Sequence, residues 1–209
     1  DLHSFPTRRS SDLQLAKGNL VREIDALGGE QGRAADHATL HLRWLNTSKG
    51  FAVRTLRAQC DMGDYAEWYA RSIAERPLLH PYQAMVSRIV AEEGTVQGVV
   101  TTAGEKFMAK RIVVASGTYL RGKVYLGLRT FDSGPVGQLP AKELSESLQE
   151  LGLELGRFRT DTTPRICRYS IDWQSLKLQP SDDEPEAFSY WSEKRIHLGY
   201  HCEIGRAHV

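Results

Sequence analysis

The sequence has few cysteines and no long hydrophobic run, and each absence excludes a class of protein. Its three cysteines, Cys60, Cys167 and Cys202, are scattered along 209 residues and form no C-x-x-C pair. Such a set fits neither a disulfide framework nor a structural zinc site, and indicates a reducing compartment such as the cytoplasm. No stretch approaches the roughly 18 apolar residues of a membrane helix, so no membrane span is predicted.

The chain also lacks an excess of charge of either sign. Lysine and arginine number 27 against 26 aspartates and glutamates, which gives a formal net charge of +1. A strongly basic coat for nucleic acid is therefore excluded, although a local basic patch is not. With 41% hydrophobic and 25% charged residues, the composition is that of a folded globular protein.

The two ends do not resemble protein sequence. Residues 1–13, DLHSFPTRRSSDL, have no apolar periodicity, and residues 203–209 read EIGRAHV. Back-translated in frame, both match the adapters that flank inserts in short-read sequencing libraries. We therefore expect both ends to be translated adapter, and residues 14–202 to be an internal piece of a longer protein.

The first part of this insert has a helical pattern. Apolar residues at helical spacing predict a helix over 19–27 that is stopped by Gly28-Gly29. A second helix is predicted through HLRWLN (41–46), and a third over 52–76, which ends before Pro77.

The pattern then changes to strands. Three runs over 82–116, separated by EEG and AGE turns, predict a β-meander. The last run ends in Val113-Val114-Ala115-Ser116, and a strand without polar alternation is typical of a parallel sheet buried on both faces. A helix is predicted over 141–152, and a strand and a turn over 152–166. The sequence therefore predicts an α/β protein.

The first candidate site follows that apolar run. A glycine at the carboxyl end of a parallel strand lets the backbone approach a ligand, and Ser116-Gly117-Thr118 stands at this place. The alternative is a tight turn out of a core strand.

Basic residues give a second signal. Lys49, Arg54 and Arg57 would lie near the start of the 52–76 helix, where they could bind an anion or form a solvated face. Another basic cluster, interleaved with Phe158 and Tyr169, could grip single-stranded RNA or be an ordinary surface. Its members are Arg157, Arg159, Arg165 and Arg168.

Other site types have little support. His197, His201 and Cys202 are too loosely spaced to predict a metal site, and His37 and His41 lack the glutamate of H-E-x-x-H. Neither a G-x-S-x-G elbow nor a P-loop is present.

Four ordered segments together carry a specific signal: AKGNLVREIDALGG, LNTSKGFAVRTLRAQCD, VVASGTYLRGKVYLG and SGPVGQLPAKELSESLQELGLELGRFRTDTTPRI. In this order they resemble the MnmG (GidA) family of flavin-dependent tRNA uridine modification enzymes. The resemblance implies a glutathione-reductase-like, two-dinucleotide-binding (FAD/NAD(P)) fold. Residues 14–165 would be a partial FAD-binding domain without its N-terminal G-x-G-x-x-G turn, and residues 166–202 would begin an inserted NAD-binding domain.

The resemblance also implies an activity. Members work with the GTPase MnmE and use methylenetetrahydrofolate, with glycine or ammonium, to add a carboxymethylaminomethyl-type group to carbon 5 of the tRNA wobble uridine. FAD handles the redox step, NADH can reduce it, and the enzyme is expected to be a cytoplasmic homodimer. The fragment alone is expected to be inactive and not to hold FAD stably.

The resemblance further assigns site residues. Val86, the Ser116-Gly117-Thr118 turn and Ala141, where many relatives carry serine, would contact FAD. The anion or tRNA contacts would be Lys49, Arg54, Arg57 and Arg165.

The chain departs from the family pattern at several positions. Phe51 replaces a usual proline and Met62 a usual arginine, while Asp161 and Thr163 interrupt T-G-T-P-P-R. No cysteine matches the functional cysteines of the family, so no catalytic residue is assigned.

Two alternatives stay open. One is an RNA- or partner-binding fragment without redox chemistry. The other is a different two-dinucleotide flavoprotein, such as a relative of folate-dependent tRNA methyltransferase. The K-G-F-A-V-R and S-G-P-V-G stretches disfavour this second alternative.

Overall fold

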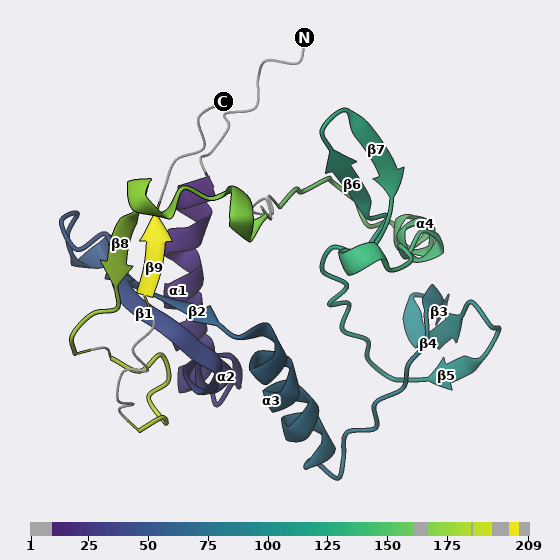
Figure 1. The fold of residues 1–209 in the computed structure, drawn as a ribbon. Coiled ribbons are helices and arrows are strands. Elements are labelled where there is room, and N and C mark those ends of the chain that lie inside the picture. The colour runs from purple at the N-terminus through teal and green to yellow at the C-terminus, as the bar shows by residue number, and fades with distance from the viewer. Residues whose placement is uncertain (1–9, 161–166, 185, 194–200, 205–209) are drawn as a thin grey trace. The chain divides into compact units, whose positions relative to one another are not determined.

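The computed structural model describes residues 10–160, 167–184, 186–193 and 201–204. The chain divides into two compact units, which are described separately (Figure 1). Unit 1 comprises Asp1–His80 and Asp161–Val209, and unit 2 comprises residues 81–160.

Unit 1 begins with two helices, α1 (Ser10–Ala26) and α2 (Gln31–Ala38). The helix predicted over 19–27 is confirmed, although α1 starts earlier, at Ser10. Gly28 ends it in the left-handed region (φ 85°) and donates its N–H to the Asp25 carbonyl at 2.8 Å.

An antiparallel hairpin follows where two helices were predicted. β1 (Thr39–Leu45) pairs with β2 (Thr55–Cys60), and a short 3₁₀ turn, η1 (Phe51–Val53), lies in the loop. The predictions of helix over 41–46 and from residue 52 were therefore wrong. The residues of the two segments lie opposite one another as in an antiparallel ladder, with Leu42 opposite Ala58 and Trp44 opposite Leu56.

The long predicted helix is confirmed only in its second half, as α3 (Met62–Ala74). It begins there because the Asp61 carboxylate accepts the N–H groups of Gly63 at 2.7 Å and Asp64 at 3.1 Å. Such a side-chain N-cap satisfies donors that have no partner inside the helix.

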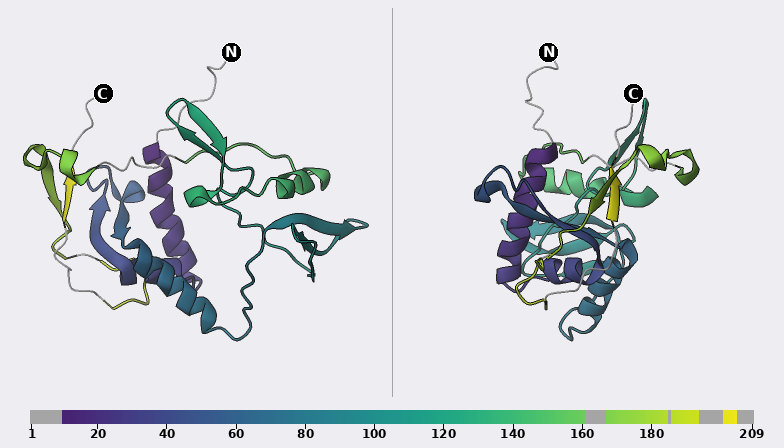
Figure 2. Two further views of the ribbon diagram at one scale, coloured as in Figure 1. Left: turned by 45° about the vertical axis from the view of Figure 1, so that its right-hand side comes forward. Right: turned by 60° about the vertical axis from the view of Figure 1, so that its left-hand side comes forward.

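The later part of the chain returns to unit 1. It contains two 3₁₀ turns, η3 (Arg168–Ser170) and η4 (Trp173–Ser175), and the strand β8 (Lys177–Pro180), which pairs with β9 (His201–Ile204). Phe188 is buried with Leu42 and Leu56 in the core of the unit. The two views of Figure 2 show α1 beside the hairpin of β1 and β2. Assignment of residues 166–202 to an NAD-binding domain stays a prediction.

Unit 2 contains the predicted meander. β3 (Val86–Glu92), β4 (Thr95–Thr101) and β5 (Lys106–Met108) form one antiparallel sheet in that order. The predicted helix is confirmed as α4 (Glu143–Glu150), which packs on β3. Its Leu144 and Leu148 form the core of the unit with Ile89 and Ala141.

The remaining elements of unit 2 are the hairpin of β6 (Lys123–Leu126) and β7 (Arg129–Asp132) and the 3₁₀ turn η2 (Pro135–Gly137). The buried strand predicted at 113–116 is absent, and Val113 is 90% exposed. Residues 153–160 form no strand either.

The sheet pairing explains why that prediction failed. An all-apolar strand is stable when neighbouring strands flank it, and every sheet among the described residues is antiparallel and omits 109–122. The described chain is therefore a mixed α/β structure with small sheets, whereas the glutathione-reductase-like topology stays a prediction.

Candidate functional site

The turn to which the resemblance assigns cofactor contacts lies on the surface of unit 2. Gly117 adopts φ 52°, and both it and Thr118 are exposed. A Cβ added at Gly117 would meet no atom within 4 Å. Within the described residues, the N–H groups of Gly117 and Thr118 have no hydrogen-bond partner. Free N–H groups at an open turn can bind an anion such as phosphate.

Ala141 supports this turn from behind. Its N–H donates to the Tyr119 carbonyl at 2.9 Å, and its carbonyl accepts the Arg121 N–H at 3.0 Å. The residue is 5% exposed and packs in the core of the unit. Ala141 therefore holds the chain just after Thr118 in place, and has no side-chain donor to offer a cofactor.

Val86 packs against the same core. It is the first residue of β3, lies opposite Thr101, and is half-buried. Tyr119, next to the turn, packs there too. The fold thus gathers Val86, Ala141 and the residue that follows the turn around one apolar cluster, although they are distant in the sequence.

Two glycines that the sequence reasoning did not single out shape the turn. A Cβ at Gly122 would overlap the carbonyl oxygens of Ser133 and Thr118. A Cβ at Gly134 would lie 2.9 Å from the Leu139 carbonyl oxygen. Only glycine permits this close backbone approach, and the glycine-rich sequence over 122–137 was the available signal.

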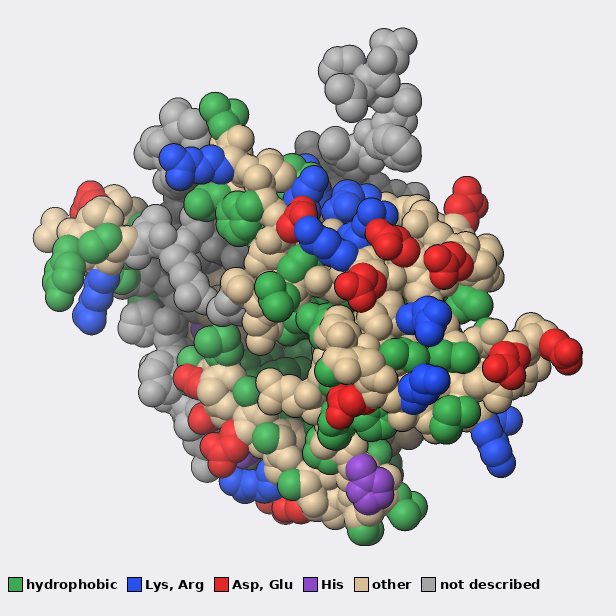
Figure 3. Space-filling model, turned by 90° about the vertical axis from the view of Figure 1, so that its right-hand side faces the viewer, with side chains coloured by type: hydrophobic (Ala, Val, Ile, Leu, Met, Phe, Trp, Pro, Cys, Tyr) green, Lys and Arg blue, Asp and Glu red, His purple; other side chains and the backbone are tan. Residues whose placement is uncertain are grey.

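The carboxylate of Asp132, the last residue of β7, lies among cations. Lys142 Nζ lies 2.6 Å from the Asp132 carboxylate, and this contact lowers the pKa of Asp132 below its ordinary value. The charges of Lys123 and Arg157 lower the pKa of Asp132 further. Figure 3 shows lysine and arginine side chains beside acidic ones on the surface. Three cations around one carboxylate leave a local positive charge.

The second predicted set, Lys49, Arg54 and Arg57, lies in unit 1. Lys49 and Arg54 belong to the β1–β2 loop, whereas Arg57 lies on β2 opposite Arg43. The prediction that Arg54 and Arg57 share a helical face was therefore wrong, because the segment is a hairpin. Arg165 lies outside the described residues, as do Asp161 and Thr163.

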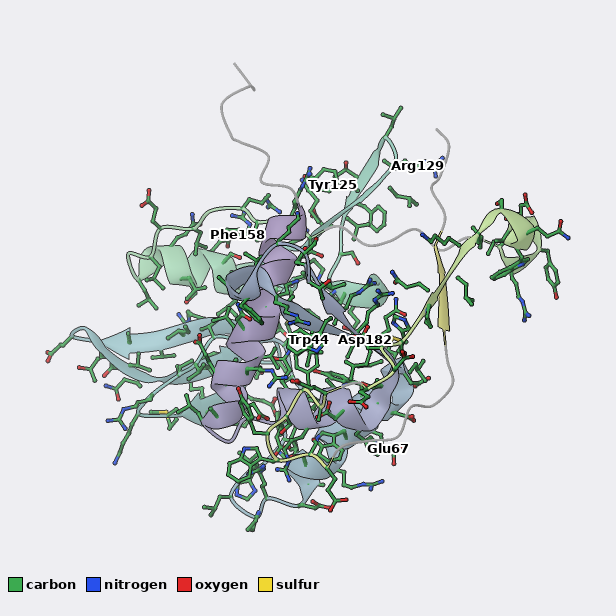
Figure 4. All side chains as sticks on the ribbon, turned by 90° about the vertical axis from the view of Figure 1, so that its left-hand side faces the viewer. Trp44, Glu67, Tyr125, Arg129, Phe158 and Asp182 are labelled. Carbon is green, nitrogen blue, oxygen red and sulfur yellow. The ribbon has the colours of Figure 1, made fainter. Side chains whose placement is uncertain are left out.

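Arg54 has instead an aromatic environment. Its guanidinium lies 5.2 Å from the centroid of the Trp44 ring and 5.6 Å from that of Phe51. These are cation–π distances. Figure 4 labels Trp44, whose backbone N–H donates to the neighbouring Asp182 carboxylate at 2.6 Å.

The two histidines of the i, i+4 pair, His37 and His41, have structural surroundings. The His37 ring lies 4.9 Å from the Trp68 ring, and Nε2 of the buried His41 is 3.1 Å from the Gln179 carbonyl oxygen. No group of three metal-ligating side chains converges among the described residues. In the same part of the chain, no helix has the length and apolarity needed to cross a membrane.

Comparison with known proteins then places the chain. The family model described as "Glucose inhibited division protein A" (GIDA) matches residues 4–207. The chain belongs to the GidA family.

Named relatives agree with this placement. A Bacillus cereus protein named tRNA uridine 5-carboxymethylaminomethyl modification enzyme MnmG is 49% identical over 181 residues, which cover 87% of this chain and 29% of the relative. A protein of the same name from Lactobacillus delbrueckii subsp. bulgaricus is 46% identical over 183 residues, with 88% and 29% covered. The chain thus spans 29% of the length of these relatives.

A solved GidA structure has the same local fold. The form II crystal structure of Aquifex aeolicus GidA matches with a TM-score of 0.81 and 35% identity, covering 90% of this chain and 32% of the other. The form I crystal gives a TM-score of 0.79 at 36% identity, with 93% and 32% covered. The described residues therefore fold as part of a GidA protein does.

Proposed function

We propose that this chain is part of an FAD-dependent enzyme that modifies carbon 5 of the wobble uridine of tRNA. The observation that supports the proposal most strongly is the 49% identity to Bacillus cereus MnmG over 87% of the chain. The product would be a carboxymethylaminomethyl-type group, the modification in the name of that relative.

In this proposal unit 2 contributes to FAD binding. Bound FAD would supply the redox chemistry of the reaction. The exposed turn offers it the N–H groups of Gly117 and Thr118, which have no other partner within the described residues. Val86, Ser116 and Ala141 would also contact FAD, with Val86 and Ala141 in the apolar cluster against which Tyr119 packs. Lys123, Lys142 and Arg157 add a positive field that suits the cofactor's phosphates.

The activity would need further components, each of which follows from the family resemblance. These are tRNA as substrate, MnmE as GTPase partner, methylenetetrahydrofolate as carbon donor and NADH as reductant of the flavin. We also propose a homodimeric, cytoplasmic protein with a glutathione-reductase-like fold, in which residues 14–165 serve FAD and residues 166–202 begin an NAD-binding domain.

A chimaeric enzyme tests the proposal. Residues 14–202 would replace the matching segment of Bacillus cereus MnmG, with the unaltered Bacillus enzyme as control. Flavin absorbance after desalting measures FAD retention, and mass spectrometry of tRNA nucleosides from a strain without its own enzyme measures modification. We expect bound flavin and modified uridine. A folded chimaera that binds tRNA but holds no flavin would contradict the proposal and favour the binding-module alternative.

A further inference from the structure

The cation at the end of the β1–β2 loop is incompletely satisfied. Arg54 Nε is buried and has no hydrogen-bond partner within the described residues. None of the ion pairs among these residues includes Arg54 either. A buried donor without a partner costs free energy, so this guanidinium is prepared to accept an anion.

Its neighbour Arg22 provides an internal comparison. Arg22 also lies over the Trp44 ring, at 5.9 Å from the centroid. It donates to the Ala187 carbonyl at 3.1 Å and lies 3.6 Å from a Glu186 carboxylate oxygen. Arg22 therefore has structural partners for its charge, whereas Arg54, on the same indole ring, has only aromatic ones.

The surroundings of Arg54 are open and positively charged. The Phe51 ring, which packs against the guanidinium, is 87% exposed. Lys49, at the start of the same loop, is exposed and has no ion pair within the described residues. The nearby Asp182 carboxylate is already occupied by the Trp44 N–H and by Arg43 at 4.0 Å. Two cations and an exposed ring thus share one loop.

We propose that this loop, residues 49–54, is a binding site for single-stranded RNA. Arg54 and Lys49 bind phosphates of the strand, and a base stacks on Phe51. Proteins commonly bind single-stranded RNA with cations that contact its phosphate backbone and with aromatic rings on which its bases stack. The inference rests on the proposed function, since it names the part of this chain that tRNA would contact.

The exposure of Phe51 favours RNA over a dinucleotide cofactor. A site for a small molecule buries about 70–90% of its ligand in a concave pocket. A ring that is 87% exposed on a loop offers instead a platform across which a strand can lie.

Fluorescence anisotropy of the full 209-residue chain with a labelled anticodon stem-loop RNA tests the site. Phe51→Ala should weaken binding about tenfold, the typical effect of losing one stacked base. Arg54→Gln should weaken it and reduce the slope of log K against log salt by about 0.7, the value for one phosphate contact on a single strand. Arg54→Lys should keep that slope, because the charge remains.

Arg71→Gln is the matched control. Arg71 is an exposed arginine of the same unit that already lies 2.8 Å from the Glu67 carboxylate, so its loss should leave RNA affinity unchanged. If Arg54→Gln fails to fold, Phe51→Ala still tests the RNA site, because Phe51 is exposed and its loss should not affect folding. Circular dichroism checks the fold of every variant.

Three results would overturn the inference. They are absence of RNA binding by the folded chain, unaltered binding by both Phe51→Ala and Arg54→Gln, and full competition by FAD or NADH, which would assign the loop to a dinucleotide. Each is distinguishable from failure of the proposed function, because flavin retention and uridine modification by the chimaera are measured separately.

Discussion

The interactions that stabilise unit 1 internally differ from those that stabilise unit 2. In unit 1, buried carboxylates join segments that are far apart in the sequence. Asp36 accepts the backbone N–H groups of Phe188 at 2.6 Å and Ser189 at 2.9 Å, and Asp25, which is 0% exposed, accepts that of Tyr190 at 2.8 Å. Unit 2 is instead stabilised by hairpins and by an apolar core, all formed within residues 81–160.

Because of this difference, we expect the two units to lose stability through different substitutions. Removal of a carboxylate from unit 1 leaves buried N–H groups without a partner, which costs more than a lost contact alone. An apolar core loses stability in proportion to the volume removed, because the surrounding side chains can partly relax. Unit 1 should therefore depend strongly on single polar residues, and unit 2 on its larger aliphatic ones.

Asp36→Ala should have the largest effect. It removes two hydrogen bonds to a charged acceptor, each worth about 1.5–3 kcal/mol, so the free energy of unfolding should fall by about 3–6 kcal/mol. Urea denaturation measures this change. Hydrogen exchange at the Phe188 and Ser189 amides should accelerate.

Two variants sharpen this test. Asp36→Asn keeps one acceptor oxygen and should lose about half as much stability. Asp183→Ala, at an exposed carboxylate of the same unit, should change stability by less than about 0.5 kcal/mol. Equal losses for Asp36→Ala and Asp183→Ala would refute the importance of the buried carboxylate.

Leu148→Ala is the corresponding test of unit 2. Leu148 is buried against Ile89 and Leu144, and its truncation should cost about 2–5 kcal/mol. Leu139→Ala, at an exposed leucine, is the matched control. If protection from hydrogen exchange in the sheet of β3, β4 and β5 were unchanged by Leu148→Ala, the apolar cluster would not be the support of this unit.

Gly122→Ala should have a smaller effect that is centred on the candidate site. The added methyl group would overlap the carbonyl oxygens of Thr118 and Ser133, and such overpacking costs about 1–3 kcal/mol. In the chimaera, flavin retention should fall because the Ser116–Thr118 turn is displaced. Gly156→Ala, where a Cβ meets nothing within 4 Å, should leave flavin content unaltered.

The smallest effect concerns pH. Lys142 holds the pKa of Asp132 below its ordinary value of 3.8, so the folded state is stabilised when this carboxylate is charged. This stabilisation is present above the ordinary pKa and is lost as the pH falls through the lowered pKa. Carboxyl NMR titration should show the pKa of Asp132 rising in Lys142→Ala and unchanged in Lys110→Ala.

The sequence pattern correctly predicted the elements that are stabilised by contacts between residues close in sequence. The EEG turn and the strands around it gave the meander, and the amphipathic pattern of 141–152 gave α4. The β2 strand was predicted as helix because Val53 and Leu56 lie three residues apart, which is a helical spacing, and Leu42 and Leu45 of β1 have the same spacing. Only the packing of Leu42 and Leu56 against Phe188, more than a hundred residues later, selects the strand.

The residues of the candidate site stay a prediction from the sequence, and their geometry could not be predicted from it. The glycine of Ser116-Gly117-Thr118 indicated an approachable turn, yet the sequence placed it at the end of a strand that the described chain does not form. The support by Ala141 depends on backbone bonds between distant segments, which leave no local pattern. The aromatic surroundings of Arg54 likewise follow from the hairpin and not from helical spacing.

The central claim is that the Ser116–Thr118 turn of unit 2 contacts the flavin, whereas the loop of residues 49–54 in unit 1 contacts the RNA. Flavin content and RNA affinity, measured together on two variants of the chimaera, test it most directly. Gly117→Val should lose flavin and keep RNA affinity, and Arg54→Gln should keep flavin and lose RNA affinity. If each variant lost both properties while circular dichroism showed an intact fold, the division of function between the turn and the loop would be contradicted.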